Sequence, residues 1–458
     1  MMPRSKTRGP TIADLATALE TGATTSRALV EDCLSRIDDP SGEGARAFIY
    51  VDRAKAVAAA DTYDLLRKAG RAPTAYAGIP ISIKDLFDLE GEPTLAGSKV
   101  LRGAPPAVRD AEAIGRLKRA GLIPIGRTNM TEFAFSGLGL NPHYGTPLSI
   151  WDRETGRIPG GSSSGAAVSV ADGMAHAGIG TDTGGSCRIP AAFNALVGYK
   201  PTAHRISRQG VLPLSTTLDS VGVLARSVAC CETIDAIMAG SSPPAVARFE
   251  GSDLRILVPL NVVLADMEPE VELAFGQALE CLRKLGATIC EEKFDELDAI
   301  LALTAKGGFS APECLAWHQR LIARAAYAYD PRVLTRIVSG GQQSAVDYIQ
   351  LTNGRRNIVE RVRHRLSGFD VVAFPTTPIV PPKLSQISSD EIYASLNRLC
   401  LRNPSFVNMW DGCAISLPIG KRGNAPIGLT LAAAGDKDAH LFSCARTVEA
   451  MLNAEGGR

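Results

Sequence analysis

Long apolar runs and an excess of one charge are both missing from the 458-residue chain. No stretch of 18 apolar residues occurs, so the sequence predicts no membrane-spanning helix. Residues 1–6 lack the hydrophobic core of a signal peptide, which favours a cytoplasmic location. The 49 basic and 48 acidic side chains give a net charge of +1, which argues against a nucleic-acid-binding surface.

Residue patterns typical of metal sites are missing as well. The ten cysteines include the adjacent pair Cys230–Cys231 and are otherwise scattered, without a CxxC motif. The six histidines form no HExxH or related ligand spacing. We therefore expect buried, reduced cysteines and no structural zinc.

Aromatic residues are scarce, at 5%, while 44 glycines and 28 prolines indicate a closely packed backbone with many turns. The length fits about three average domains or one large domain. Apolar periodicity and β-branched runs predict alternating helices and strands, and hence an α/β sheet wrapped by helices. The expected helices are 11–20, 26–37, 51–68, 110–120, 166–172, 270–285 and 440–452, and the expected strands are 77–84, 122–125, 371–374, 414–417 and 427–431.

Residues 159–165, Pro-Gly-Gly-Ser-Ser-Ser-Gly, form the densest motif. A phosphate-binding P-loop requires Lys and Ser/Thr after its last glycine, where this chain has Ala166–Ala167, so that motif is excluded. Residues 161–165 satisfy G-x-S-x-G, the nucleophile elbow of α/β-hydrolases, but the elbow follows a buried strand and residues 151–157 are polar. Taken alone, the motif indicates a structural glycine loop.

A second glycine-rich turn, 180–190, contains Ser186 directly after a glycine pair. Consecutive glycines allow several backbone N–H groups to converge on one point, as a developing oxyanion requires. Ser186 still needs a base, and neither turn contains a histidine. The candidate is Lys84, since burial lowers the pKa of an amine and favours its neutral form. The alternative is a lysine whose stem covers apolar surface while its charge reaches solvent.

Together these segments resemble the amidase signature family, whose catalytic unit is a Ser–cis-Ser–Lys triad. The bridging and nucleophilic serines of that family stand 24 positions apart, as Ser162 and Ser186 do here. The resemblance covers nearly the whole chain. It implies a large mixed β-sheet surrounded by helices, in one domain over 1–458 with a variable, mostly helical substrate-side segment at about 300–410. The matching segments are 78–85, 159–165, 180–193, 197–202, 417–418 and 426–429.

The resemblance implies that Ser186 is the nucleophile and Lys84 the neutral general base. Ser162, entered through a cis peptide after Gly161, relays the proton between them. The acyl group on Ser186 is then transferred to water, or to another amine. No cofactor and no metal are implied.

The same resemblance implies roles for the residues around the triad. Ser163 is expected to hydrogen-bond near Lys84, and Asp182 and Arg188 to brace the turn. Cys187, where the family commonly has a branched aliphatic residue, is interpreted as a packing residue and not as a second nucleophile. The oxyanion hole is expected to consist of the backbone N–H groups of Thr183, Gly184, Gly185 and Ser186.

Three activities stay open on this fold. Residues 137–141 lack the pattern associated with the tRNA amidotransferase A subunit, and no Gly-Val-Arg-Tyr-Gly type segment occurs between 300 and 360. Segments 313–320 and 329–332 instead resemble free-standing amidases, which favours a hydrolase acting alone. The amidotransferase subunit, which requires a B-subunit partner, and a non-catalytic binding protein are the alternatives.

The predicted substrates are small aryl or alkyl amides, with carbamates (urethanes) and esters as further candidates, since each forms the same tetrahedral oxyanion. A homodimer is also possible by resemblance. His318 beside Trp317 is a weaker candidate, because such residues on a helix usually pack. The expected pocket residues are Phe133, Phe135, Leu138, Phe309, Trp317, Tyr327 and Met409.

Overall fold

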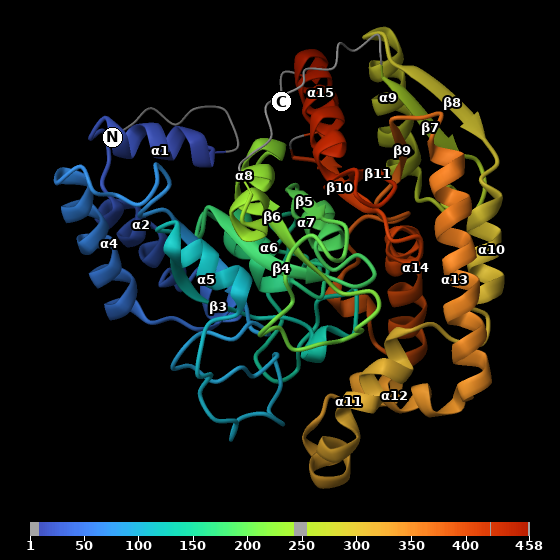
Figure 1. Ribbon diagram of the computed structural model, residues 1–458, viewed down its shortest axis with the longest axis horizontal. Coiled ribbons are helices and arrows are strands. Elements are labelled where there is room, and N and C mark those ends of the chain that lie inside the picture. The colour runs from blue at the N-terminus through green and yellow to red at the C-terminus, as the bar shows by residue number, and fades with distance from the viewer. Residues whose placement is uncertain (1–8, 242–253, 422, 457–458) are drawn as a thin grey trace.

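The computed structural model describes residues 9–241, 254–421 and 423–456 (Figure 1). Strands from both halves of the chain form one mixed sheet of 11 strands in the order β1-β3-β2-β4-β6-β5-β10-β11-β9-β7-β8. The expected α/β fold with a large mixed sheet is therefore confirmed. The strands are β1 (Phe48–Tyr50), β2 (Pro80–Lys84), β3 (Ile123–Thr128), β4 (Ala177–Asp182), β5 (Val197–Lys200), β6 (Ser220–Ala225), β7 (Arg255–Pro259), β8 (Thr288–Glu292), β9 (Val371–Pro375), β10 (Cys413–Pro418) and β11 (Gly428–Ala433).

Helices surround the sheet, as Figure 1 shows, with the blue N-terminal helices at one end of the view and α10 and α13 at the other. The first helices begin at threonine caps, Thr11 before α1 and Thr25 before α2. The helices are α1 (Ile12–Glu20), α2 (Ser26–Ile37), α3 (Gly44–Ala47), α4 (Arg53–Lys68), α5 (Glu112–Arg119), α6 (Ser164–Ala171), α7 (Arg188–Phe193), α8 (Val228–Ala239), α9 (Pro269–Lys284), α10 (Asp295–Leu303), α11 (Ser310–Ala325), α12 (Pro331–Val338), α13 (Ala345–Leu366), α14 (Asp390–Met409) and α15 (Asp438–Gly456).

Both faces of the sheet are buried, which alternating residues of β9 make clear. Val371 and Ala373 pack into a cluster that includes residues of α8, α9 and α15. Val372 and Phe374 pack into a second cluster with residues of α10, α13 and α14. Successive side chains of a strand point to opposite faces, so the two clusters lie on opposite sides of the sheet.

The predicted elements are present with small changes at their ends. The strand predicted at 77–84 is shorter, since β2 begins at Pro80, after Gly78 in a left-handed conformation. The glycine-rich region contains β4 and α7, and β6 to β8 follow it; none of these was predicted. No helix within the described residues is long and apolar enough to cross a membrane.

The order of the strands positions the site. The neighbouring strands β2 and β4 run parallel, so their carboxyl ends meet at one edge of the sheet. Lys84 is the last residue of β2, and Asp182 is the last residue of β4. The glycine-rich turn before α7 therefore starts beside Lys84.

Candidate active site

Lys84 is completely buried at the end of β2. Its ammonium nitrogen donates hydrogen bonds to Ser162 Oγ at 2.7 Å and to Thr181 Oγ1 at 2.9 Å. Burial lowers the pKa of Lys84 from 10.5 to about 8, because desolvation disfavours the charged form, and nearby acidic groups only partly oppose this. Of the two interpretations, the buried lysine is therefore correct and the solvent-reaching lysine is wrong.

Ser162 and Ser163 lie in the loop before α6, and both are completely buried. The peptide bond between Gly161 and Ser162 is cis, as the resemblance implies. Ser163 does not contact the Lys84 ammonium; its hydroxyl donates to the Thr181 carbonyl at 3.4 Å. Thr181, which the sequence analysis did not select, thus connects Lys84 with Ser163. The elbow hypothesis fails, because no strand lies in the described segment before this loop.

Ser186 follows the glycine pair of the turn and is 4% exposed. Its carbonyl accepts a hydrogen bond from the Ser163 N–H at 3.3 Å, which places its backbone against the loop that contains Ser162. Within the described residues, Ser162 Oγ contacts Lys84 and makes no hydrogen bond to Ser186. Gly185 has a φ of +126°, and a Cβ there would lie 2.6 Å from Pro404 Cγ, so both conformation and space require glycine.

The turn offers fewer free N–H groups than the sequence suggested. The Gly185 N–H donates to Asp182 Oδ1 at 2.9 Å. Those of Thr183, Gly184 and Ser186 donate to no described residue. Three of the four expected oxyanion donors are thus available without breaking a hydrogen bond.

A buried ion pair holds the turn. Arg188 donates to both carboxylate oxygens of Asp182, at 2.8 and 3.0 Å, and both side chains are completely buried. Burial alone raises the pKa of Asp182, but the charge and hydrogen bonds of Arg188 hold it below its ordinary value. Asn408 of α14 completes the network by contacting both residues. Asn408 was not predicted, because it lies 220 positions after Arg188.

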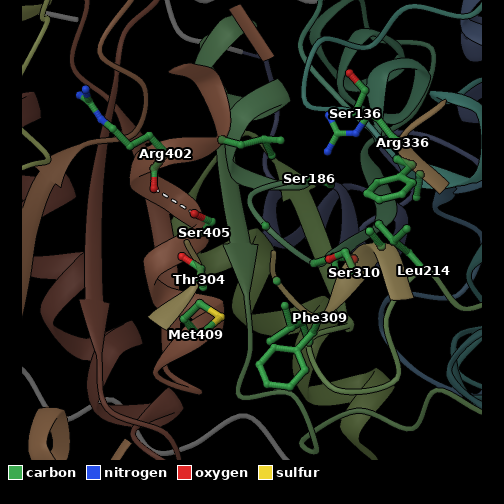
Figure 2. Close-up of a pocket in the computed structure, with 18 of the residues that line it drawn as sticks. Ser136, Ser186, Leu214, Thr304, Phe309, Ser310, Arg336, Arg402, Ser405 and Met409 are labelled. Atoms are coloured by element: carbon green, nitrogen blue, oxygen red, sulfur yellow. Dashed lines mark hydrogen bonds between the residues drawn. The ribbon is translucent and has the colours of Figure 1, made fainter. Parts of the chain in front are cut away.

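A cavity of about 350 Å³ opens at Ser186 (Figure 2). Thr183 and Gly184 of the turn line it together with Ser186, α14 supplies much of the remaining wall, and α10, α11 and α12 contribute further residues. Most of its lining is apolar, and it contains two arginines, Arg336 and Arg402. In the view of Figure 2, Ser186 lies between these two side chains. The cavity can therefore hold a small molecule against the Ser186 hydroxyl and the free N–H groups.

Comparison with known proteins identifies the family. The family model described as amidase matches residues 28–442. The chain belongs to the amidase family. It is accordingly a hydrolase of carbon–nitrogen bonds.

Individual relatives cover almost the full chain. A 2-amino-5-chloromuconic acid deaminase from Comamonas testosteroni is 35% identical, over 88% of this chain and 87% of that protein. The glutamyl-tRNA(Gln) amidotransferase A-subunit of Chloroflexus aggregans is 34% identical, over 92% of each protein. A crystal structure of an amidase superposes with a TM-score of 0.86 at 30% identity, covering 96% of this chain and 99% of the other. The proteins that this chain is similar to thus include a deaminase, an amidase and a subunit of an amidotransferase.

The predicted pocket of this amidase is partly wrong. Phe135, Phe309 and Met409 do line the cavity. Phe133 and Leu138 are buried in apolar clusters and are not among its lining residues, and Tyr327 is 92% exposed. Residues that the sequence analysis missed include Leu214, Leu218, Ile300, Leu401 and Phe406, as well as the two arginines.

The weaker candidates, Trp317 and His318, pack instead of lining the cavity. Trp317 is 39% exposed, and its ring lies near that of Phe133. His318 is completely buried and pairs with Tyr329, with 2.8 Å between Nδ1 and the phenol oxygen. Burial lowers the pKa of His318 to about 4, so the neutral ring is favoured. Helix periodicity alone cannot distinguish such packing residues from ligand contacts.

Cys187 is completely buried beside small residues of α6 and α7. Burial and the neighbouring Asp182 raise the pKa of its thiol. A thiol with a raised pKa forms little thiolate, so its environment fits packing and not nucleophilic attack.

Proposed function

We propose that this amidase hydrolyses small linear amides through an acyl-enzyme on Ser186, with Ser162 and Lys84 transferring the proton. The observation that carries the proposal is the 2.7 Å contact between Lys84 Nζ and Ser162 Oγ in a fully buried site beside the Ser186 turn. Burial supplies what a lysine base needs, because it brings the pKa of Lys84 to about 8. The neutral amine is then accessible near neutral pH.

In the acylation step, Ser186 Oγ attacks the amide carbon and transfers its proton to Ser162 Oγ, which passes its own proton to neutral Lys84. This step needs a hydrogen bond between Ser186 Oγ and Ser162 Oγ while the substrate reacts. The C–N bond then breaks, and the amine departs with the proton that Lys84 returns through Ser162. Lys84 is neutral again at the end of the step, and the acyl group is bound as an ester to Ser186.

In the deacylation step, water attacks the ester carbon and the same relay removes its proton. The bond to Ser186 Oγ breaks, the hydroxyl recovers a proton, and a carboxylic acid is released. Both steps pass through a tetrahedral intermediate with a negatively charged oxygen. The free N–H groups of Thr183, Gly184 and Ser186 donate hydrogen bonds to that oxygen. One such donor contributes about 3–4 kcal/mol to stabilising the transition state.

The same acyl-enzyme chemistry extends to carbamates and esters, whose carbonyl carbons give an equivalent tetrahedral intermediate. The second candidate activity is that of an amidotransferase component, which the 34% identical relative favours. The two differ in their dependence on a partner. A free-standing amidase turns over small amides alone, whereas the amidotransferase component would release ammonia from glutamine only with its partner present.

The test is release of 4-nitroaniline or 4-nitrophenol from a panel of anilides, carbamates and esters. We expect turnover by the wild type, and its loss in both Ser186→Ala and Lys84→Ala. Removing a nucleophile or its base typically costs several orders of magnitude in rate. Unchanged turnover by the folded Ser186→Ala variant would refute Ser186 as the nucleophile. If the wild type alone turned over none of the substrates, the amidotransferase activity would be favoured.

A further inference from the structure

The cavity at Ser186 has an unbalanced charge. Its lining contains two arginines, Arg336 and Arg402, and no aspartate or glutamate among the described residues. Arg402 is already paired, because its guanidinium contacts Asp266 at 3.0 Å and the Ala265 carbonyl. The unbalanced charge is therefore that of Arg336.

Arg336 lies on α12 and is partly buried. Its guanidinium carbon stands 4.6 Å from the centre of the Phe135 ring, and both residues line the cavity. No described side chain or carbonyl accepts a hydrogen bond from the guanidinium, and no described carboxylate forms an ion pair with it. A cation in a largely apolar cavity loses hydration, and stacking on one aromatic ring compensates only part of that cost.

Arg332, one helical turn before Arg336, differs from it in having a carboxylate partner. Arg332 lies on the same helix and donates to Asp390 at 2.7 Å. It lies outside the lining of the Ser186 cavity. On α12, the arginine away from the nucleophile thus has a carboxylate, and the one beside the cavity has none.

A guanidinium binds a carboxylate in a planar, two-pronged arrangement, and it keeps its charge at any physiological pH. We infer that the substrate of this cavity carries a carboxylate, which Arg336 binds while the scissile amide carbon lies at Ser186. This inference rests on the proposed function and narrows it. The substrate class becomes that of amic acids, in which an apolar chain joins an amide to a carboxylate.

The test compares matched substrates. Monoamides of linear dicarboxylic acids with four to eight carbons are paired with alkyl amides of the same length, and kcat/KM is measured for each. We expect the wild type to prefer the acids. In Arg336→Gln, kcat/KM for the acids should fall about 10- to 100-fold, mainly through KM, which corresponds to about 1.4–2.8 kcal/mol. The neutral amides should change by less than about twofold.

Two further variants complete the set. Arg336→Lys keeps the charge but not the two-pronged geometry, so it should restore part of the preference for acids. Arg332→Gln is the matched control and should leave both series unchanged. An equal loss for acids and neutral amides in Arg336→Gln would mean that Arg336 only packs on Phe135, and would overturn the inference while the proposed function stands.

A binding measurement separates this inference from the proposed function. The same amic acids are titrated calorimetrically into Ser186→Ala and into Ser186→Ala combined with Arg336→Gln. Binding that is present in the first and lost in the second supports the carboxylate site even if no amide is turned over. Equal affinity in both, or no binding to either, overturns it.

Discussion

In the proposed mechanism Lys84 links catalysis to stability, and replacing it with methionine tests the stability side of that link. Burial lowers the pKa of Lys84 from 10.5 to about 8. A difference of that size corresponds to about 3 kcal/mol of free energy, since a tenfold change in proton affinity is about 1.4 kcal/mol. The buried amine therefore destabilises the folded wild type by about 3 kcal/mol at pH values below 8.

The sign of the pH dependence follows from the lowered pKa. Between pH 8 and 10.5 the unfolded chain holds the Lys84 proton and the folded chain does not. The free energy of unfolding of the wild type therefore rises across that window, by about 3 kcal/mol. Lys84→Met lacks this contribution. The variant also loses the hydrogen bonds to Ser162 and Thr181, at a cost of about 1–3 kcal/mol that does not depend on this titration.

The quantity to measure is the difference in free energy of unfolding between the wild type and Lys84→Met, from urea denaturation followed by circular dichroism. We expect it to shift by about 3 kcal/mol in favour of the wild type between pH 7 and 10.5. Lys437→Met, which removes an exposed lysine, is the control and should run parallel to the wild type. If the free energy of unfolding of Lys84→Met changed with pH in parallel with that of the wild type, the lowered pKa of the buried amine would be refuted.

Two further predictions concern the base and the ion pair. The kcat/KM of the wild type should rise with pH through about 8, because Lys84 has to be neutral to accept a proton; a pH–rate profile that is already flat below pH 7 would contradict this. Arg188→Met leaves the buried Asp182 carboxylate without its cation, so the free energy of unfolding should fall by about 3–5 kcal/mol in urea denaturation. A loss below about 1 kcal/mol would show that the pair contributes little to holding the turn.

The elements with a strong periodic pattern could be predicted from the sequence. The predicted helix 26–37 coincides with α2, and the helix predicted at 270–285 differs from α9 by one residue at each end. Strand β4 was missed because it reads Ala-Gly-Ile-Gly-Thr-Asp, with few of the β-branched residues that mark a strand. The small residues are required by packing, since a Cβ at Gly180 would lie 2.7 Å from Ser163 Oγ.

Some residues of the candidate site could likewise be identified from the sequence, and others could not. Lys84 and Ser186 could be selected from local motifs, and Ser162 from the resemblance to the amidase signature family; the fold brings their segments together. Thr181 and Asn408 carry no motif, and their contacts depend on how β4 and α14 pack. Arg336 is one of many arginines in a charged helical region, and only the structure distinguishes it from Arg332, through the cavity and through the Asp390 ion pair of Arg332. Long-range packing of this kind leaves no periodic signal in the sequence.

The central claim, that Ser186 carries the acyl group, is tested most directly by trapping the intermediate. The protein is mixed with a 4-nitrophenyl ester, quenched in acid and digested, and the modified peptide is identified by mass spectrometry. We predict one acyl group, attached to Ser186 and absent from Ser186→Ala. An acyl group on Ser163 or Cys187, or equal labelling of Ser186→Ala, would contradict the account.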